Sequence, residues 1–476
     1  MRPRERPGLF HTMGRVVRCF LVTFSAAMVA CAPTVKKAER VFTPSIKSEK
    51  EMGQEFAQEA AKKLSLVEDP EVVEYVSRIG EPIIRAAQPM PYKFRFHVVK
   101  SPSLNAFAVP GGHLYLFSGL LLKAQSANEV AAVIAHELSH VKHRHTAQMI
   151  GKGTLVSLTS LAAILVGAVA TGGEGGQAVM AGALGAGQAA QLAFTREFEE
   201  EADRFGVFYM YQAGYDPRGL LDFFATMNRE QRLLTSRIPP YLLTHPMAPE
   251  RMDQIENLIR VHRLEVREPR EEPDFYRFQG ILQAEVGEPT QTIPLLRQRV
   301  EDRPDDPRRW HQLALTYIKS GWTNEALKAL ETVVSLDPGL SPAWLDLGAL
   351  LARLERTDEA QEAFRRALAS RPEYAKAYVE WGKMLLRKNQ AADGLALLDK
   401  AVSMDPNLIL VHELRAKAKK EMKDEAGFHE EMASYYEKLD RSLDAIQHLR
   451  QALKVHGENT PKGEEVKRRI DLIRSS

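Results

Sequence analysis

The C-terminal part of the chain repeats its pattern of large, small and proline positions at a fixed interval. Three separate series recur every 34 residues, and coincident series with one period predict a stack of helix pairs, an α-solenoid. From about residue 409 the pattern degenerates, and residues 442–454 are expected to form a second helix after an insertion or cap. The series are Tyr276, Trp310, Trp344 and Tyr378; Pro304, Pro338, Pro372 and Pro406; and Ala326, Ala360 and Gly394.

The preceding part of the chain mixes helix and strand patterns. Apolar residues at helical spacing fill residues 126–140, whereas residues 103–117 read as a strand, a glycine turn and a second strand. We therefore expect an α+β, mostly helical protein. Its predicted domains span residues 44–263 and 274–476, joined by a charged, proline-containing linker at 264–273.

Two apolar segments raise the question of a membrane. A basic N-terminus precedes the apolar run 19–30, which is typical of a secretory signal and too short for an ordinary spanning helix. It ends in Met28-Val-Ala-Cys31, similar to a bacterial lipobox, so we expect residues 1–31 to be a signal peptide and Cys31 to be lipidated; plain cleavage nearby is the alternative. The run 154–171 is long enough to span a membrane. Its hydroxyl groups and the glycine-rich sequence after it favour a buried or cleft-covering helical hairpin.

Composition restricts the possible functions. Hydrophobic residues make up 44% of the chain, and 64 basic against 62 acidic residues give a net charge of +2. An ordinary globular protein is indicated, without the basic excess that nucleic-acid binding requires. The only cysteines are Cys19 and Cys31, so the mature body has no disulfide.

The pentapeptide His136-Glu-Leu-Ser-His140 carries the first candidate chemistry. Residues four apart on a helix lie one turn apart on the same face, so His136 and His140 can both reach one Zn²⁺ at about 2.1 Å. Glu137 would flank the metal and take a proton from the attacking water. The alternative is an ordinary amphipathic helix, capped by Ser126 or Asn128, whose histidines happen to share a face.

A third metal ligand has to come from another element. His143 also lies on that face, but seven residues from His136 correspond to about 10.5 Å of rise, too far for one metal along a single helix. The acidic stretch 195–206 is a candidate because it lies within a helical pattern. Composition alone favours a solvated surface for such a stretch.

The two motifs together resemble the M48 family of zinc metallopeptidases, in which H-E-x-x-H is followed by R-x-x-E-x-x-A-D. The resemblance implies a gluzincin-type fold and one Zn²⁺ per chain, with Glu199 as the third ligand. It places Asp203 where its carboxylate can accept the free N–H of a ligating histidine. Glu197, Glu200 and Glu201 are ranked below Glu199 as ligands.

The resemblance extends to the strand–turn–strand segment. In M48 peptidases this hairpin borders the cleft, and a substrate can add to its edge as an extra strand. The implied substrate-binding residues are Asn105, Ala106, Phe107 and Ala108. A plain core hairpin is the alternative for the side chains that point inward.

The segment Leu242-Leu-Thr-His-Pro-Met-Ala-Pro-Glu-Arg251 resembles a subgroup of M48 enzymes with C-terminal tetratricopeptide repeats, and Trp344-Leu-Asp-Leu-Gly348 fits the signature of those repeats. The resemblance implies that His245 can occupy the fourth position of the zinc and block the site until it moves. Two alternatives stay open for His245: a donor to the developing oxyanion, or a turn residue before Pro246.

These observations predict an exported zinc metalloendopeptidase in which Glu137 deprotonates water and then protonates the leaving amine. The resemblance implies the periplasm of a Gram-negative bacterium, an outer-membrane anchor and unfolded outer-membrane proteins as substrates, with the repeats docking substrate or the barrel-assembly machinery. One rival hypothesis is a chaperone or assembly scaffold with a latent protease site. Another is a membrane-embedded stress protease, which rests on residues 154–171.

Overall fold

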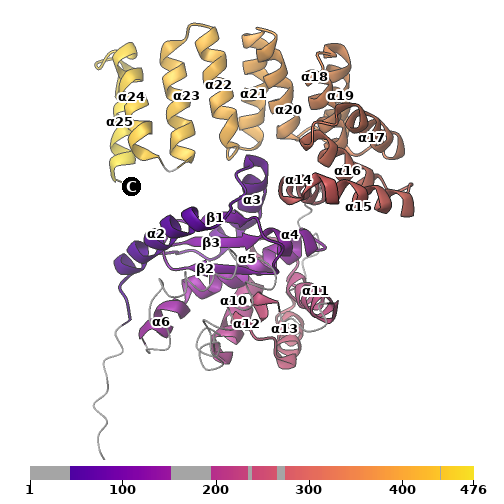
Figure 1. The fold of residues 1–476 in the computed structure, drawn as a ribbon. Helices are drawn as coiled ribbons and strands as arrows, with labels where there is room; N and C mark the ends of the chain where they lie inside the picture. Colours follow the sequence, from indigo (N-terminus) through magenta and orange to yellow (C-terminus); the bar gives the residue numbers. More distant parts are fainter. Residues whose placement is uncertain (1–42, 152–194, 234–238, 265–273, 440, 476) are drawn as a thin grey trace, which may run out of the picture. The chain divides into compact units, whose positions relative to one another are not determined.

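The computed structural model describes residues 43–151, 195–233, 239–264, 274–439 and 441–475. The expected signal peptide at 1–31, its Cys31, and the apolar run 154–171 lie outside these ranges. Within them, no helix is both long and apolar enough to cross a membrane. Helices dominate and surround one three-stranded sheet (Figure 1), so the prediction of a mostly helical α+β protein is confirmed.

The sheet consists of β1 (Arg95–Val99), β2 (Ala106–Val109) and β3 (His113–Phe117). The central strand β3 pairs in parallel with β1 and antiparallel with β2, in the order β1-β3-β2. Gly111 and Gly112 make the predicted turn between β2 and β3 with φ angles of +93° and +90°, a conformation that residues with a side chain rarely adopt. Both β1 and β2 are edge strands.

Helices cover both faces of the sheet. Along β3, Leu114 and Leu116 belong to the main hydrophobic core, whereas Tyr115 and Phe117 belong to a smaller core that includes Phe56. This alternation follows from the two-residue period of a strand with both faces buried. The covering helices are α2 (Ile46–Lys63) on the smaller core, and α3 (Pro70–Ala86) and α5 (Ala127–Lys142) on the main core.

The central element of this domain is α5, which packs against the sheet, α3 and three later helices. Nearly all of its residues are buried, and the side chain of Ser126 caps its start by accepting a hydrogen bond from the Glu129 N–H at 3.3 Å. The remaining helices of this part are α4 (Ser118–Lys123), α6 (His145–Gly151), α10 (Arg196–Gln212), α11 (Gly219–Leu233), α12 (Pro240–Thr244) and α13 (Pro249–His262).

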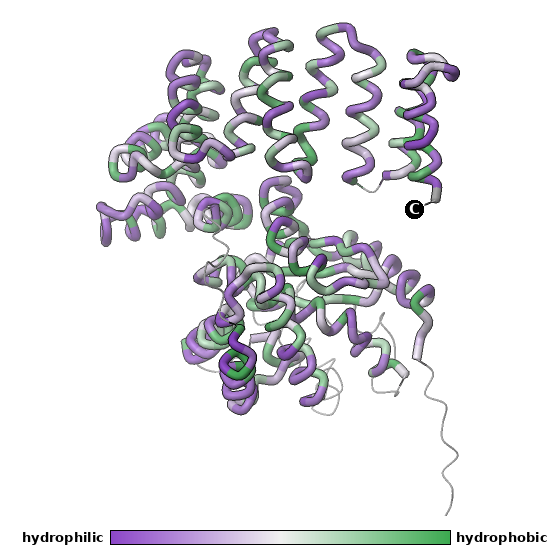
Figure 2. The backbone as a smooth tube through the Cα atoms, turned by 180° about the vertical axis from the view of Figure 1, so that it is seen from behind, coloured by the Kyte–Doolittle hydropathy of each residue, from purple (hydrophilic) through white to green (hydrophobic). Residues whose placement is uncertain are grey.

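The C-terminal helices form antiparallel pairs with the predicted period. First helices of successive pairs begin at Pro307, Ser341, Ala375 and Ile409, which are 34 residues apart. Hydrophobic and hydrophilic positions alternate along each of them (Figure 2), as expected of helices that stack on neighbours. The helices are α14 (Phe275–Val286), α15 (Pro289–Asp302), α16 (Pro307–Lys319), α17 (Thr323–Leu336), α18 (Ser341–Arg353), α19 (Thr357–Ser370), α20 (Ala375–Arg387), α21 (Ala391–Met404), α22 (Ile409–Glu421), α23 (Glu425–Lys438), α24 (Ser442–His456) and α25 (Pro461–Ser475).

The predicted insertion before residue 442 is wrong. Helices α22 and α23 keep the 34-residue step, and α24 begins at Ser442, only one residue early. Helix α24 is therefore the first helix of a further pair, and α25 is the second helix of that pair. The small-residue series ends because Phe428 occupies the next equivalent position after Gly394. The buried Ala445 is small but does not belong to this series.

Helix α14 connects the two parts of the chain physically. Phe275, Phe278 and Leu282 lie in the same hydrophobic core as the sheet and α5, while the helix also packs against α16. Its buried Arg277 donates to both carboxylate oxygens of Asp346 on α18, with a shortest distance of 2.7 Å, and pairs with Glu71 on α3. One guanidinium therefore joins three helices.

Replacing Arg277 should destabilise the protein strongly. Arg277→Ala removes the arginine partner of the buried Asp346 carboxylate and leaves it only His311, at 2.7 Å; breaking a buried ion pair typically costs about 3–5 kcal/mol. We expect a clearly lower melting temperature by circular dichroism. Arg365→Ala, which removes an exposed pair with Glu362, is the matched control and should change stability by less than about 1 kcal/mol. Equal melting temperatures for the two variants would contradict the role of Arg277.

Candidate metal centre

The two histidines of the H-E-x-x-H motif lie on α5 and are buried. Their Nε2 atoms are 3.0 Å apart and their ring centroids 4.7 Å apart. This is the geometry expected for residues one helical turn apart. The same helix carries Glu137, which is also buried.

Helix α10 brings the acidic stretch onto the histidines. Thr195 caps its start by accepting from the Phe198 N–H at 3.3 Å, and Glu199 and Asp203 share its buried face. A Cβ at Gly206 would lie 3.3 Å from the His136 backbone nitrogen. Because this position has no side chain, α10 can pass close to α5. Sequence reasoning missed the role of this glycine.

Four side chains bring their ligand atoms within 4.8 Å of one another: His136, His140, Glu199 and His245. Glu199 places Oε1 at 3.4 Å from His140 Nε2 and Oε2 at 3.6 Å from His136 Nε2. Ligands about 2.0–2.1 Å from a tetrahedral Zn²⁺ lie about 3.3–3.4 Å from each other. The donor atoms and their spacing therefore fit a tetrahedral metal ion.

His245 follows α12 and stands where a fourth ligand would. Its Nδ1 lies 3.0 Å from Glu199 Oε1 and 3.3 Å from His136 Nε2, and its ring stacks on Tyr241 with centroids 4.6 Å apart. The other nitrogen, Nε2, lies 3.3 Å from Glu137 Oε1. One imidazole thus contacts the predicted ligands and the predicted base at once.

Glu137 is held from the other side by the edge strand β2. Its Oε2 accepts the N–H of Ala108 at 3.2 Å, and burial raises the pKa of its carboxyl, which favours general-base catalysis near neutral pH. Of the four predicted substrate-binding residues, only Ala108 reaches this site. Asn105 is buried before the strand, and Ala106 and Phe107 point into the two hydrophobic cores.

Arg251 on α13 is a site residue that sequence reasoning did not assign. Its Nε and Nη2 donate to the two oxygens of Asp203 at 2.7 and 2.8 Å. Asp203 Oδ1 lies 2.9 Å from Nδ1 of His136, so Arg251 fixes the carboxylate that orients this histidine. The available signal was the arginine that closes the L-T-H-P segment.

The same arginine lies 2.7 Å from Glu199 Oε2 through Nη1, which also donates to the carbonyl of Pro246 at 2.7 Å. Burial alone would raise the pKa of the Glu199 carboxyl, but the charges of His245 and Arg251 outweigh it and hold this pKa well below its ordinary range. For Asp203, the charge of Arg251 likewise outweighs burial and lowers the pKa. Both carboxylates are therefore ionised, and Arg251 links them to the backbone beside His245.

The other predicted metal-binding histidine, His140, is supported by a different pair. Its Nδ1 lies 2.9 Å from Nδ1 of His145, whose Nε2 lies 3.1 Å from Glu201 Oε2. Glu200 instead pairs with Arg196 at the surface. Glu199 and Asp203 are thus the members of the acidic run that contact the H-E-x-x-H histidines, and Glu201 acts one step further out.

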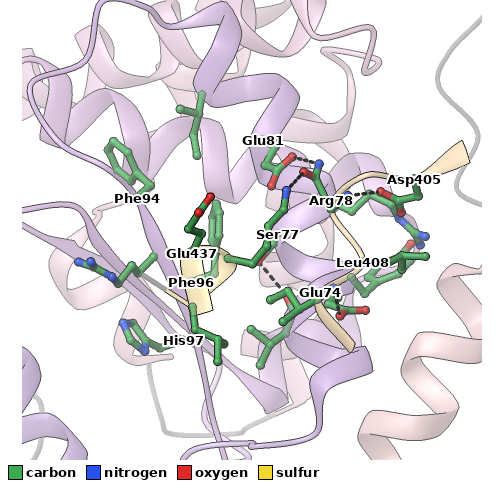
Figure 3. Close-up of a pocket in the computed structure, with 18 of the residues that line it drawn as sticks. Glu74, Ser77, Arg78, Glu81, Phe94, Phe96, His97, Asp405, Leu408 and Glu437 are labelled. Carbon is green, nitrogen blue, oxygen red and sulfur yellow. Dashed lines mark hydrogen bonds between the residues drawn. The ribbon is translucent and has the colours of Figure 1, made fainter. Parts of the chain in front are cut away.

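A pocket of about 500 Å³ lies away from this cluster and includes none of its residues. Glu74, Arg78 and Glu81 of α3 line one side and Asp405 of the repeats another (Figure 3). Its lining therefore combines charges of both signs. It also contains Phe96 and His97 of β1, together with Leu408 and Glu437.

Two histidines one turn apart, a carboxylate from a second helix and an adjacent glutamate define the site of an H-E-x-x-H metallopeptidase. Residues 70–259 match peptidase family M48, and residues 287–371 and 345–409 match tetratricopeptide repeat families. The chain therefore contains an M48 metallopeptidase domain followed by tetratricopeptide repeats, as its motifs predicted.

Relatives of this chain carry names that agree with the family. The beta-barrel assembly-enhancing protease of Escherichia coli is 28% identical over 64% of this chain and 63% of its own length. The protein of the same name from Yersinia pestis is 30% identical over 45% of this chain and 44% of its own length. The mitochondrial metalloendopeptidase OMA1 of Schizosaccharomyces pombe is 30% identical over 38% of this chain and 51% of its own length. The chain spans less than two thirds of the length of each.

Arg251→Lys should weaken metal binding although it keeps the charge. A lysine cannot make the paired hydrogen bonds to Asp203, so His136 loses its fixed orientation, and we expect the metal affinity to fall about 10- to 100-fold. Competition with a chelator, followed by metal analysis, measures this. Arg260→Lys on the exposed face of the same helix is the control. An unchanged affinity in a folded Arg251 variant would show that Asp203 holds His136 unaided.

Proposed function

We propose that this protein is a zinc metalloendopeptidase. The observation that carries the proposal is the buried cluster of His136, His140 and Glu199, with Glu137 beside it. Imidazole nitrogens combined with one carboxylate are typical ligands of catalytic zinc, whereas Mg²⁺ and Ca²⁺ prefer oxygen atoms. The M48 match supports the same conclusion.

When bound, Zn²⁺ would polarise the scissile carbonyl and make water beside it more acidic. Glu137 would accept a proton from the attacking water and deliver it to the leaving amine. The Ala108 N–H engages Oε2 of Glu137, so Oε1 is the oxygen available for this transfer. In the present arrangement Oε1 faces His245, which means that the base can act on water only after this ring moves.

His245 is therefore proposed as a gate. A catalytic zinc needs one position open to water or substrate, and Nδ1 of His245, which lies close to Glu199 and His136, would take that position. A resting protein with this ring in place would be latent. Its proximity to Glu137 supports the gate over the turn-residue alternative, because a single movement would free both the metal position and the base.

We propose that substrates are extended polypeptides bound along β2. This strand is an edge of the sheet, and edge strands can bind a further strand through backbone hydrogen bonds with little dependence on sequence. Ala108 lies on this strand in contact with Glu137. A chain paired with β2 would therefore pass next to the base.

The cellular role is proposed from the relatives and the N-terminal sequence. Two relatives are named beta-barrel assembly-enhancing proteases, which supports degradation of misfolded or stalled outer-membrane proteins in the periplasm. Cys31 would provide a lipid anchor at the outer membrane. The repeats would bind substrate or the barrel-assembly machinery, since stacked helix pairs create extended binding surfaces.

A second candidate function follows from the same gate. If His245 stays in place under most conditions, the protein would act chiefly as an envelope chaperone or scaffold that binds proteins through its repeats. The observation that favours this reading is that His245 contacts both a predicted ligand and the predicted base. The two functions differ in whether proteolysis is required.

Casein cleavage by the purified protein separates these readings. Glu137→Gln should lower the rate by roughly 10²–10⁴-fold, because it removes the general base, and should still bind zinc. His245→Ala should cleave faster than the wild type. A slower His245→Ala enzyme with zinc bound would instead support the oxyanion-donor hypothesis. No cleavage by the wild type or His245→Ala, with zinc confirmed, would favour the scaffold.

The control for the gate is His262→Ala. His262 is an exposed histidine on α13 that packs against Phe208, outside the cluster. Its removal should leave both the rate and the zinc content unchanged. A comparable rise in rate for both histidine variants would point to a general loosening of this region and would argue against a specific gate.

A further inference from the structure

A second cluster of three residues lies beside the candidate metal centre and contributes no ligand to it. His143 is the C-terminal cap of α5, His145 begins α6, and Glu201 is on α10. Their ligand atoms all lie within 4.8 Å of one another. His145 is fully buried, whereas the side chains of His143 and Glu201 are 14% and 36% exposed. This second cluster can therefore be reached from solvent.

We propose that His143, His145 and Glu201 form a second site for a divalent cation of the zinc type, and that its occupation inhibits the peptidase. Glu201 presents Oε2 at 3.1 Å from His145 Nε2 and Oε1 at 3.4 Å from His143 Nδ1. These distances fall in the range of 3.0–3.6 Å found among the ligand atoms of the primary cluster. Two imidazoles and one carboxylate are again a donor set suited to zinc.

The inhibition follows from the contact between His145 and His140. When His140 holds a metal through Nε2, its Nδ1 carries the ring proton and donates it to Nδ1 of His145 at 2.9 Å. His145 then carries its own proton on Nε2 and donates it to Glu201. This chain of hydrogen bonds orients His140, as such partners generally orient metal ligands.

A second cation would disrupt that chain. It would take the place of the proton on His145 Nε2, and a neutral His145 would then hold its proton on Nδ1, opposite the N–H of His140. Two N–H groups facing each other repel, so His140 would lose its acceptor and move. The second cation would thus weaken binding of the first, and by reciprocity the first would weaken the second. The second site should fill only at higher zinc concentration.

The experiment is zinc titration of the full chain with two readouts. Equilibrium dialysis should find two bound zinc ions per wild-type chain and one per His143→Ala chain. In the casein assay, excess zinc should slow the wild type by about tenfold or more and leave His143→Ala unaffected, with equal rates at one equivalent. His143→Gln, which keeps a polar side chain of similar length against Phe205, should behave like His143→Ala.

His429→Ala is the matched control. His429 and His448 form a histidine pair in the repeats with Nδ1 atoms 3.0 Å apart. A zinc ion bound to this pair would not act on His145 or His140. This variant should keep both the second zinc and the inhibition. A single zinc in the wild type, or a second zinc and inhibition that persist in His143→Ala, would overturn the proposal.

The inhibitory effect rests on the proposed peptidase activity, but the second binding step does not. If no variant cleaved casein, the proposed function would fail while the dialysis result would still decide the second site. A second zinc lost in His143→Ala would support the site in that case, and one zinc throughout would reject it.

Discussion

The close packing of α10 against α5 is the constraint on which the site depends. Because Gly206 has no side chain, α10 can lie directly against the backbone of α5 at His136. The neighbouring Ala202 is fully buried. At this separation, Glu199 and Asp203 reach across to His136 and His140. A larger residue at either small position would push the helices apart, because packed interiors transmit volume changes to their neighbours. Ligand atoms from different helices could then no longer meet at one point.

The same packing buries many ionisable groups, which is unfavourable unless each has a partner. Arg251 meets this requirement for Glu199 and Asp203 and is itself held by the carbonyl of Pro246. The backbone beside His245 is therefore tied to the groups that support the metal ligands. A movement of the proposed gate would be transmitted to that arginine, so gate position and metal binding are physically coupled.

The repeats are joined to the metallopeptidase domain by more than a linker. Helix α14 contributes Phe275 and Phe278 to the domain core and packs on α16, and Arg277 ties α14 to α3 and α18 through buried ion pairs. Separating the repeats from the domain would expose these charges and apolar side chains. A partner bound to the first repeats could thus act directly on α3, which packs against α5.

By itself, the sequence determined the features whose geometry is local. A helix places His136, Glu137 and His140 on adjacent positions whatever surrounds it, and a 34-residue period specifies stacked helix pairs wherever they lie. Family resemblance added Glu199, Asp203 and His245, which the structure brings to the histidines. Only the tertiary structure decided that Arg251 supports Asp203 and that His145 and Glu201 support His140. It also decided that α14 packs both in the domain core and against the repeats, and that α24 starts a new helix pair. These contacts join residues far apart in sequence, and they depend on which helix faces the whole core brings together.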